Sequence, residues 1–151
     1  MGMHKYIALL RGINVSGQKL IRMADLRQHC EAAGLQEVET YIQSGNIIFA
    51  ADAGMTDELA RRIEQLLVAH HGFEVRTLVF TPGDLAGVLA GNPFLQDPDK
   101  DLARTYVTFL ESHPTPEALA RLDGVDYSPE AYVLSGRYLY FIRPRATVAP
   151  R

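Results

Sequence analysis

Several residue types that would settle the class of a protein are scarce in this sequence. It has one cysteine, Cys30, and no tryptophan. A single cysteine cannot close an internal disulfide, and Cys30 falls on the apolar face of an expected helix, which indicates a buried structural thiol. No apolar run approaches the roughly 20 residues of a membrane-spanning helix. We therefore expect a cytoplasmic protein with no membrane partner.

A large excess of either charge is also missing. The 151 residues carry 15 Lys and Arg against 18 Asp and Glu, which gives a net charge of −3. Binding to nucleic acids draws its affinity from the neutralisation of phosphates by Lys and Arg, so we expect no nucleic-acid partner. The hydrophobic share of 47% is enough for one domain, or for two small halves that share a core.

Hydrophobic periodicity predicts alternating strands and helices over the first half of the chain. Apolar residues recur at helical spacing from Met23 to Ala33 and from Leu59 to His70, and each stretch stops at a glycine. Strands are expected at 6–10, 38–42, 47–50 and 75–80. The order strand, helix, strand, strand, helix, strand is the split βαβ arrangement of ferredoxin-like folds.

Two sequence patterns recur in the second half, which indicates an internal duplication. "YIALL" at Tyr6 is echoed by "YVTFL" at Tyr106, and "YIQSGNIIF" at Tyr41 by "YVLSGRYLY" at Tyr132. We therefore predict an α+β fold of duplicated ferredoxin-like (βαββαβ) halves. Its expected parts are a first half at 4–81, a connecting helix and loop at 82–103, a partial second half at 104–142, and a C-terminal tail at 143–151.

The predicted topology gathers polar residues at one rim of the first half. The first two strands run parallel, so the end of the first lies beside the turn that follows the second. The helix that begins at Met23 has no Ser, Thr, Asp or Asn immediately before it, which leaves its first N–H groups for an anion, although Asp25 competes for the same positive potential. The candidate ligand-binding residues at this rim are Arg11, Asn14, Lys19, Ser44 and Asn46.

The rim includes the stretch "GINVSGQKL" at residues 12–20, which is one residue away from a phosphate-binding loop. That motif needs a Lys directly after its second Gly and then a hydroxyl that holds magnesium. Here Gln18 displaces Lys19 by one position and Leu20 replaces the hydroxyl, so we do not expect nucleotide hydrolysis. Two interpretations stay open: a loop ordered by Gly12 and Gly17, or an ordered loop that also binds a small ligand.

No constellation for catalysis or metal binding can be assigned. The five histidines show no metal-ligand spacing with Cys or carboxylates, and no nucleophile or acid–base pair is placed near a partner. We expect no catalytic residue, no metal and no other cofactor. The leading hypothesis is a non-catalytic binding module for a small anionic or nucleotide-like ligand at the rim. The alternative is a structural or protein–protein interaction module that takes no small-molecule ligand.

The segments "YIALLRGINVSGQKLIRMADLR" and "TYIQSGNIIF" are long and specific. With them the sequence resembles, from about Lys5 through Phe141, the bacterial family catalogued as domain of unknown function 1697. The resemblance implies a duplicated α+β fold with ferredoxin-like halves and no established activity. Family members usually continue into another helix and a strand carrying Arg-Asn-Trp, whereas this sequence ends in "IRPRATVAPR". We therefore expect the second half to be truncated to βαββ.

A truncated second half leaves the strand expected at 105–110 at an open edge of its sheet. That strand carries apolar side chains on both faces, and an exposed edge of this kind invites pairing with another chain. Pro144 and Pro150 make the C-terminal tail a poor covering strand. The edge can be covered by this tail, by the connector at residues 91–103, or by a second chain in a two-fold dimer, and of these we favour the homodimer.

Overall fold

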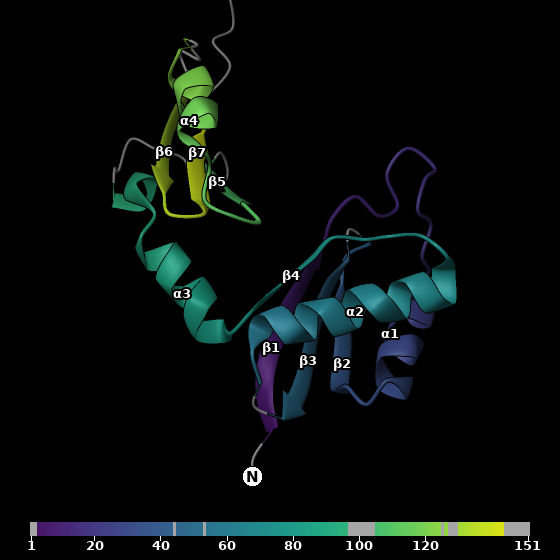
Figure 1. Cartoon of the computed structure of the whole chain (residues 1–151). Helices are drawn as coiled ribbons and strands as arrows, with labels where there is room; N and C mark the ends of the chain where they lie inside the picture. The colour runs from purple at the N-terminus through teal and green to yellow at the C-terminus, as the bar shows by residue number, and fades with distance from the viewer. Residues whose placement is uncertain are drawn as a thin grey trace, which may run out of the picture. The chain divides into compact units, whose positions relative to one another are not determined.

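The first half of the chain folds into a four-stranded antiparallel sheet with two helices on one of its faces (Figure 1). Because β1 and β2 are both antiparallel to β3, they run parallel to each other. The strand order is β2-β3-β1-β4. The elements in chain order are β1 (Met3–Leu10), α1 (Met23–Ala32), β2 (Gln36–Tyr41), β3 (Asn46–Asp52), α2 (Thr56–His71) and β4 (Thr77–Phe80).

The core of this half lies between the sheet and the two helices. Along β1 the side chains of Tyr6, Ala8 and Leu10 are buried, whereas Ile7 and Leu9 on the other face are half-buried. This alternation is the two-residue period of a strand with one covered face. The helices bury residues at helical spacing against the sheet, namely Leu26 and Cys30 from α1 and Leu59, Ile63 and Leu67 from α2.

Both expected helices of the first half are confirmed, and glycines in the left-handed conformation follow them. Gly34 has φ +96° and Gly72 has φ +78°. One strand is shifted from its expected position, and another is shorter than expected. Strand β2 spans Gln36–Tyr41, so it begins two residues earlier and ends one residue earlier than expected. Ile42, directly after it, has φ +53°, outside the extended region. Strand β4 begins at Thr77, two residues later than the sequence pattern indicates.

The segment between β1 and α1 is an ordered loop that extends beyond the end of the sheet (Figure 1). Its tip is a tight turn, in which Val15 and Gln18 pair and Ser16 and Gly17 have φ +53° and +72°. Positive φ at both central residues is the pattern of a type I′ hairpin turn. The ordered loop expected from the glycines is therefore present.

The second half contains a three-stranded antiparallel sheet in the order β5-β7-β6. Strand β7 thus lies between β5 and β6, as β3 lies between β1 and β2. The buried Tyr140 hydroxyl on β7 donates to the Val88 carbonyl oxygen at 2.9 Å, and Val88 belongs to the helix at Pro82–Ala90. The elements are α3 (Pro82–Ala90), the 3-10 helix η1 (Pro93–Gln96), β5 (Thr105–Phe109), α4 (Pro116–Asp123), β6 (Ala131–Ser135) and β7 (Tyr138–Ile142).

The computed structural model describes residues 3–43, 45–52, 54–96, 105–124, 126 and 130–143. Over these residues the fold is α+β, with two antiparallel sheets and four α-helices. The chain divides into two compact units, Met1–Ala86 and Gly87–Arg151. Among the residues described, no helix has the length and apolar character to cross a membrane.

Candidate functional site

The loop after β1 and the turn between β2 and β3 are joined at one end of the first sheet. The Leu10 N–H donates to the Gly45 carbonyl oxygen at 3.0 Å. Asn14 Nδ2 donates to the carbonyl oxygens of Gln43, at 2.8 Å, and Ile21, at 3.0 Å, while Asn14 Oδ1 accepts from the Ile21 N–H at 2.8 Å. The rim expected from the strand order therefore exists, and Asn14 holds its two segments together.

The five predicted site residues divide into different roles. Arg11 and Lys19 line a cavity beside the rim. The Asn14 side chain bonds to backbone groups, and Asn46 Nδ2 donates to the Tyr41 carbonyl oxygen at 3.1 Å. Neither asparagine lines the cavity. Ser44 lies outside the described residues.

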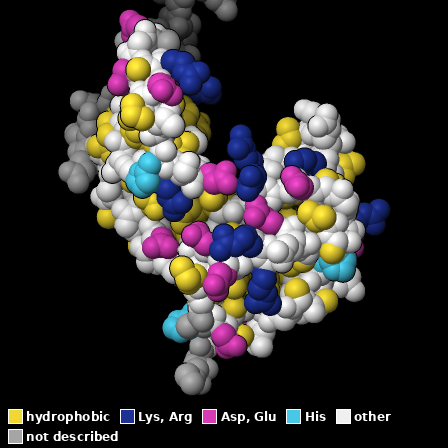
Figure 2. Space-filling view, viewed as in Figure 1, with side chains coloured by type: hydrophobic (Ala, Val, Ile, Leu, Met, Phe, Trp, Pro, Cys, Tyr) yellow, Lys and Arg dark blue, Asp and Glu magenta, His cyan; other side chains and the backbone are white. Residues whose placement is uncertain are grey.

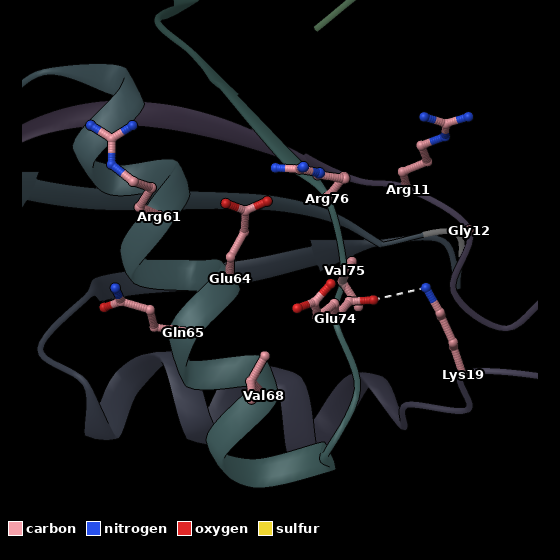
Figure 3. A pocket seen from close by; sticks show the side chains of 10 residues that line it. All are labelled: Arg11, Gly12, Lys19, Arg61, Glu64, Gln65, Val68, Glu74, Val75 and Arg76. Atoms are coloured by element: carbon pink, nitrogen blue, oxygen red, sulfur yellow. Dashed lines mark hydrogen bonds between the residues drawn. The ribbon is translucent and has the colours of Figure 1, made fainter.

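The cavity has a volume of about 670 Å³ and is walled by three segments (Figure 3). One wall is the exposed face of α2, the second is the segment that leads into β4, and the third is the loop after β1. Lys19 Nζ bridges two of these walls by donating to the Glu74 carbonyl oxygen at 2.8 Å. The lining residues are Arg11, Gly12, Lys19, Arg61, Glu64, Gln65, Val68, Glu74, Val75 and Arg76.

Positive charge prevails in the cavity, where four cations face two carboxylates, although the chain as a whole has a net charge of −3. On the surrounding face of the first unit, Lys and Arg side chains alternate with Asp and Glu (Figure 2). One of the two lining carboxylates is already engaged, because Glu64 Oε2 accepts the Thr77 N–H at 3.1 Å. The excess of positive charge is therefore a property of the cavity.

Two of the lining guanidinium groups are available to a ligand. In the part of the chain that the structure describes, neither the Arg11 nor the Arg61 side chain has a hydrogen bond or an ion pair. Both side chains are exposed. A guanidinium presents a planar fork of N–H donors that matches carboxylate and phosphate oxygens. The arrangement can therefore bind an anionic group.

Sequence reasoning missed the part of the cavity that α2 and the following segment supply. Arg61, Gln65 and Val68 recur at helical spacing on a face of α2 that the core does not use. That spacing could have placed these three on one exposed stripe. No spacing in the sequence indicated Arg76. It lies beside the rim because its carbonyl oxygen accepts the Arg11 N–H at 2.9 Å, a contact between segments that are distant in the sequence.

Other reactive side chains do not add to this site. Cys30 is buried as expected, and burial raises the pKa of its thiol to about 11, with a smaller contribution from the neighbouring charge of Glu31. Such a thiol stays protonated at neutral pH and is a poor nucleophile. Over the described ranges, no group of three His, Cys, Asp or Glu side chains has the arrangement to hold a metal ion.

Comparisons with known proteins give a family and a solved structure. The family model described as "Protein of unknown function (DUF1697)" matches residues 3–140. The structure of the conserved bacterial protein SP0830 from Streptococcus pneumoniae is similar with a TM-score of 0.77 and 28% sequence identity, over 94% of this chain and 77% of that chain. No curated protein matches.

Proposed function

The chain belongs to the DUF1697 family of proteins of unknown function, and from its geometry we propose that it is a binding module for a small anionic or nucleotide-like ligand. The ligand binds in the cavity between the loop after β1 and α2. The observation that carries this proposal is the pair of unpartnered guanidinium groups, Arg11 and Arg61, in a cavity with excess positive charge.

The size and lining of the cavity support a small molecule. Its volume of about 670 Å³ falls in the range of ligand sites in proteins, roughly 300–1,000 Å³. Val68 and Val75 add apolar surface, which would suit the non-ionic part of a nucleotide-like ligand. The exposed walls make the site shallow, so we expect modest affinity.

We propose binding without catalysis because the cationic groups of the cavity are poor proton carriers. Guanidinium groups stay protonated in proteins, so they hold an anion without exchanging its protons. The Glu64 carboxylate accepts the Thr77 N–H at 3.1 Å, so one of its oxygens is already engaged by the backbone. These groups favour recognition over acid–base chemistry.

A thermal-shift screen tests this function. We expect ATP, AMP and inorganic pyrophosphate to raise the melting temperature by mass action, and uncharged adenosine to raise it less. The Arg11→Gln, Arg61→Gln double variant should lose most of the shift. Arg27→Gln is the matched control, since Arg27 is exposed on α1, lies outside the cavity lining and pairs with Glu31 at 3.9 Å. Equal shifts in the double variant and the control would refute the site.

A second candidate function is supported by exposed apolar side chains on the same rim. Val15, Leu20 and Ile42 are 57%, 66% and 59% exposed, and all three belong to the two segments that Asn14 joins. Large apolar side chains at such exposure indicate a protein-docking surface. Under this alternative, Val15→Ser with Leu20→Ser abolishes a protein interaction and leaves the thermal shift with ATP unchanged.

We also propose that the second unit repeats part of the first, because its order β5-α4-β6-β7 matches the order β1-α1-β2-β3 of a ferredoxin-like half. Equivalent strand ends bond to equivalent turns, which supports this relation. The Leu10 N–H donates to Gly45 O, and the Leu110 N–H donates to Arg137 O at 2.8 Å. Gly45 and Gly136 both have positive φ, +90° and +60°. The loop at residues 11–22 has no equally long counterpart after β5, so the fold itself does not require it.

A further inference from the structure

Three histidine side chains meet where the end of α2 packs against α1. His29 lies on α1, and His70 and His71 are the last two residues of α2. The rings of His29 and His70 are stacked, with centroids 4.0 Å apart and planes 8° apart. His29 Nδ1 and His71 Nε2 are 3.2 Å apart. No motif links His29 to His71 in the sequence, so only the fold reveals this cluster.

The contact between His29 and His71 requires one of the two facing ring nitrogens to carry no proton. A hydrogen bond between two imidazole nitrogens needs one N–H donor and one bare nitrogen that accepts. When both rings are fully protonated, both facing nitrogens carry hydrogen, and no bond can form across 3.2 Å. The stacked ring of His70 adds a third group that becomes cationic on acidification. Acidification therefore replaces an attractive contact between the helices with repulsion.

The surroundings of His71 act in the same direction. Burial lowers its pKa below the ordinary value of 6.5, and the charges of His29 on α1 and His70 on α2 lower the pKa further. Asp25 on α1 opposes them. The folded chain thus resists a proton that the unfolded chain accepts near pH 6.5. The stability that the cluster contributes is present above about pH 6.5 and is lost as the pH falls below it.

The end of α2 that carries this cluster is also a wall of the cavity. Val68 lies three residues before His71 and Glu74 three residues after it, and both line the cavity. The Glu74 carbonyl oxygen accepts the bond from Lys19 Nζ (Figure 3). The loop that carries Lys19 leads directly into α1. The histidine cluster therefore joins the two helices whose neighbouring segments form two of the walls of the cavity.

We propose that His29, His70 and His71 form a proton-operated clamp that fixes the end of α2 against α1 at neutral pH and releases it on acidification. Release loosens the segment at residues 72–76, and the cavity then holds an anion less tightly. The regulatory role rests on the proposed function, whereas the clamp itself needs no ligand.

Amide hydrogen exchange of the full-length chain without ligand tests the clamp. Exchange is measured at about pH 7.5 and about pH 5.5 and corrected for the intrinsic pH dependence of exchange. We expect residues 70–76 to lose protection by about threefold or more at the lower pH, while the strands β1 and β3 keep theirs. The His29→Gln, His71→Gln double variant should show no such loss, because glutamine amides do not titrate. His4→Gln, an exposed histidine on β1, is the matched control and should respond as the wild type does.

Two results overturn the clamp. One is equal protection of residues 70–76 at both pH values in the wild type, and the other is an undiminished loss in the double variant. Should the double variant fail to fold, NMR titration of the wild-type imidazoles decides. Coupled titration of the three rings, with the pKa of His71 below its ordinary value, supports the clamp. Three independent titrations, each with the ordinary pKa of a histidine, refute it. Absence of ATP binding at both pH values, with the exchange response intact, refutes the proposed function and leaves the clamp standing.

Discussion

At the scale of single residues, Asn14 is the side chain on which the rim most depends. It makes three hydrogen bonds to backbone groups of two segments, and it has φ +55°. Asparagine tolerates the left-handed region better than most residues and offers both a donor and an acceptor. Its side chain therefore joins the two segments of the rim, and we expect it to order the loop that carries Lys19 rather than to bind a ligand directly.

Substitution of Asn14 by glycine isolates the contribution of its side chain, since glycine keeps the positive φ. We expect Asn14→Gly to lower the free energy of unfolding by about 2 kcal/mol, because three net hydrogen bonds are lost. Ser16→Gly is the matched control, because Ser16 also has positive φ, +53°, and lies exposed at the tip of the loop. That control should be neutral or slightly stabilising. Urea denaturation measures both, and equal effects would contradict the role assigned to Asn14.

The two hairpin glycines differ in how closely they are packed. A Cβ on Gly45 would lie 2.7 Å from Ile13 Cδ1 and 2.9 Å from Leu10 Cβ, whereas one on Gly136 would lie 3.8 Å from its nearest neighbour. Gly45→Ala adds overpacking to the cost of positive φ, about 2–4 kcal/mol in total, while Gly136→Ala costs about 1 kcal/mol. Urea midpoints test the difference, and a larger loss for Gly136→Ala would show that the turns are placed wrongly.

At the scale of elements, the helices differ in how they begin. Thr115 Oγ1 caps α4 by accepting the Ala118 N–H at 3.1 Å, and Thr81 and Asp84 cap α3 reciprocally at 3.0 Å. Helices α1 and α2 follow Arg22 and Met55, which make no side-chain cap. A capping side chain at either position would accept a hydrogen bond from the first turn of the helix and so raise the free energy of unfolding.

Met55→Ser should stabilise α2. Serine at this position would accept from the first turn of α2, and Glu58 three residues later completes a capping box. We expect the free energy of unfolding to rise by about 1 kcal/mol relative to Met55→Ala, the control for the lost exposed methionine. Urea denaturation of both variants provides the comparison. A serine variant no more stable than the alanine variant would contradict the cap.

The elements were largely predictable from the sequence, and the site was only partly so. The spacing of apolar residues and the glycines that end a helix are local features of the sequence. They therefore predicted α1 and α2 to within a few residues of their observed ends. The rim was also predictable, since strand order brings Arg11 beside the hairpin turn. Arg76 and the contact of His29 with His71 depend on packing between distant segments, which periodicity does not encode. The positive φ of Glu37 and Ile42 could not be predicted either, because both residue types normally adopt negative φ.

At the scale of the whole molecule, the second sheet leaves an apolar strand at its edge. Among the strands that the structure describes, β5 lies at one end of the sheet beside β7, and Tyr106 is 43% exposed. Edges of this kind favour association with another chain. We expect a homodimer at tens of micromolar, measured by size-exclusion chromatography with light scattering, and Val107→Lys should shift it toward monomer. A wild-type chain that stays monomeric at that concentration would contradict the expectation.

The proposed anion site is tested most directly by titrating the ¹⁵N-labelled chain with ATP and following its backbone amides by NMR. The account predicts saturable shifts at the amides of Gly12, Lys19, Val75 and Arg76, together with those of the α2 residues that line the cavity. The same titration of the Arg11→Gln, Arg61→Gln variant should show them strongly reduced. No shifts up to millimolar ATP, or shifts confined to residues outside the cavity, would contradict the claim that this chain binds an anion there.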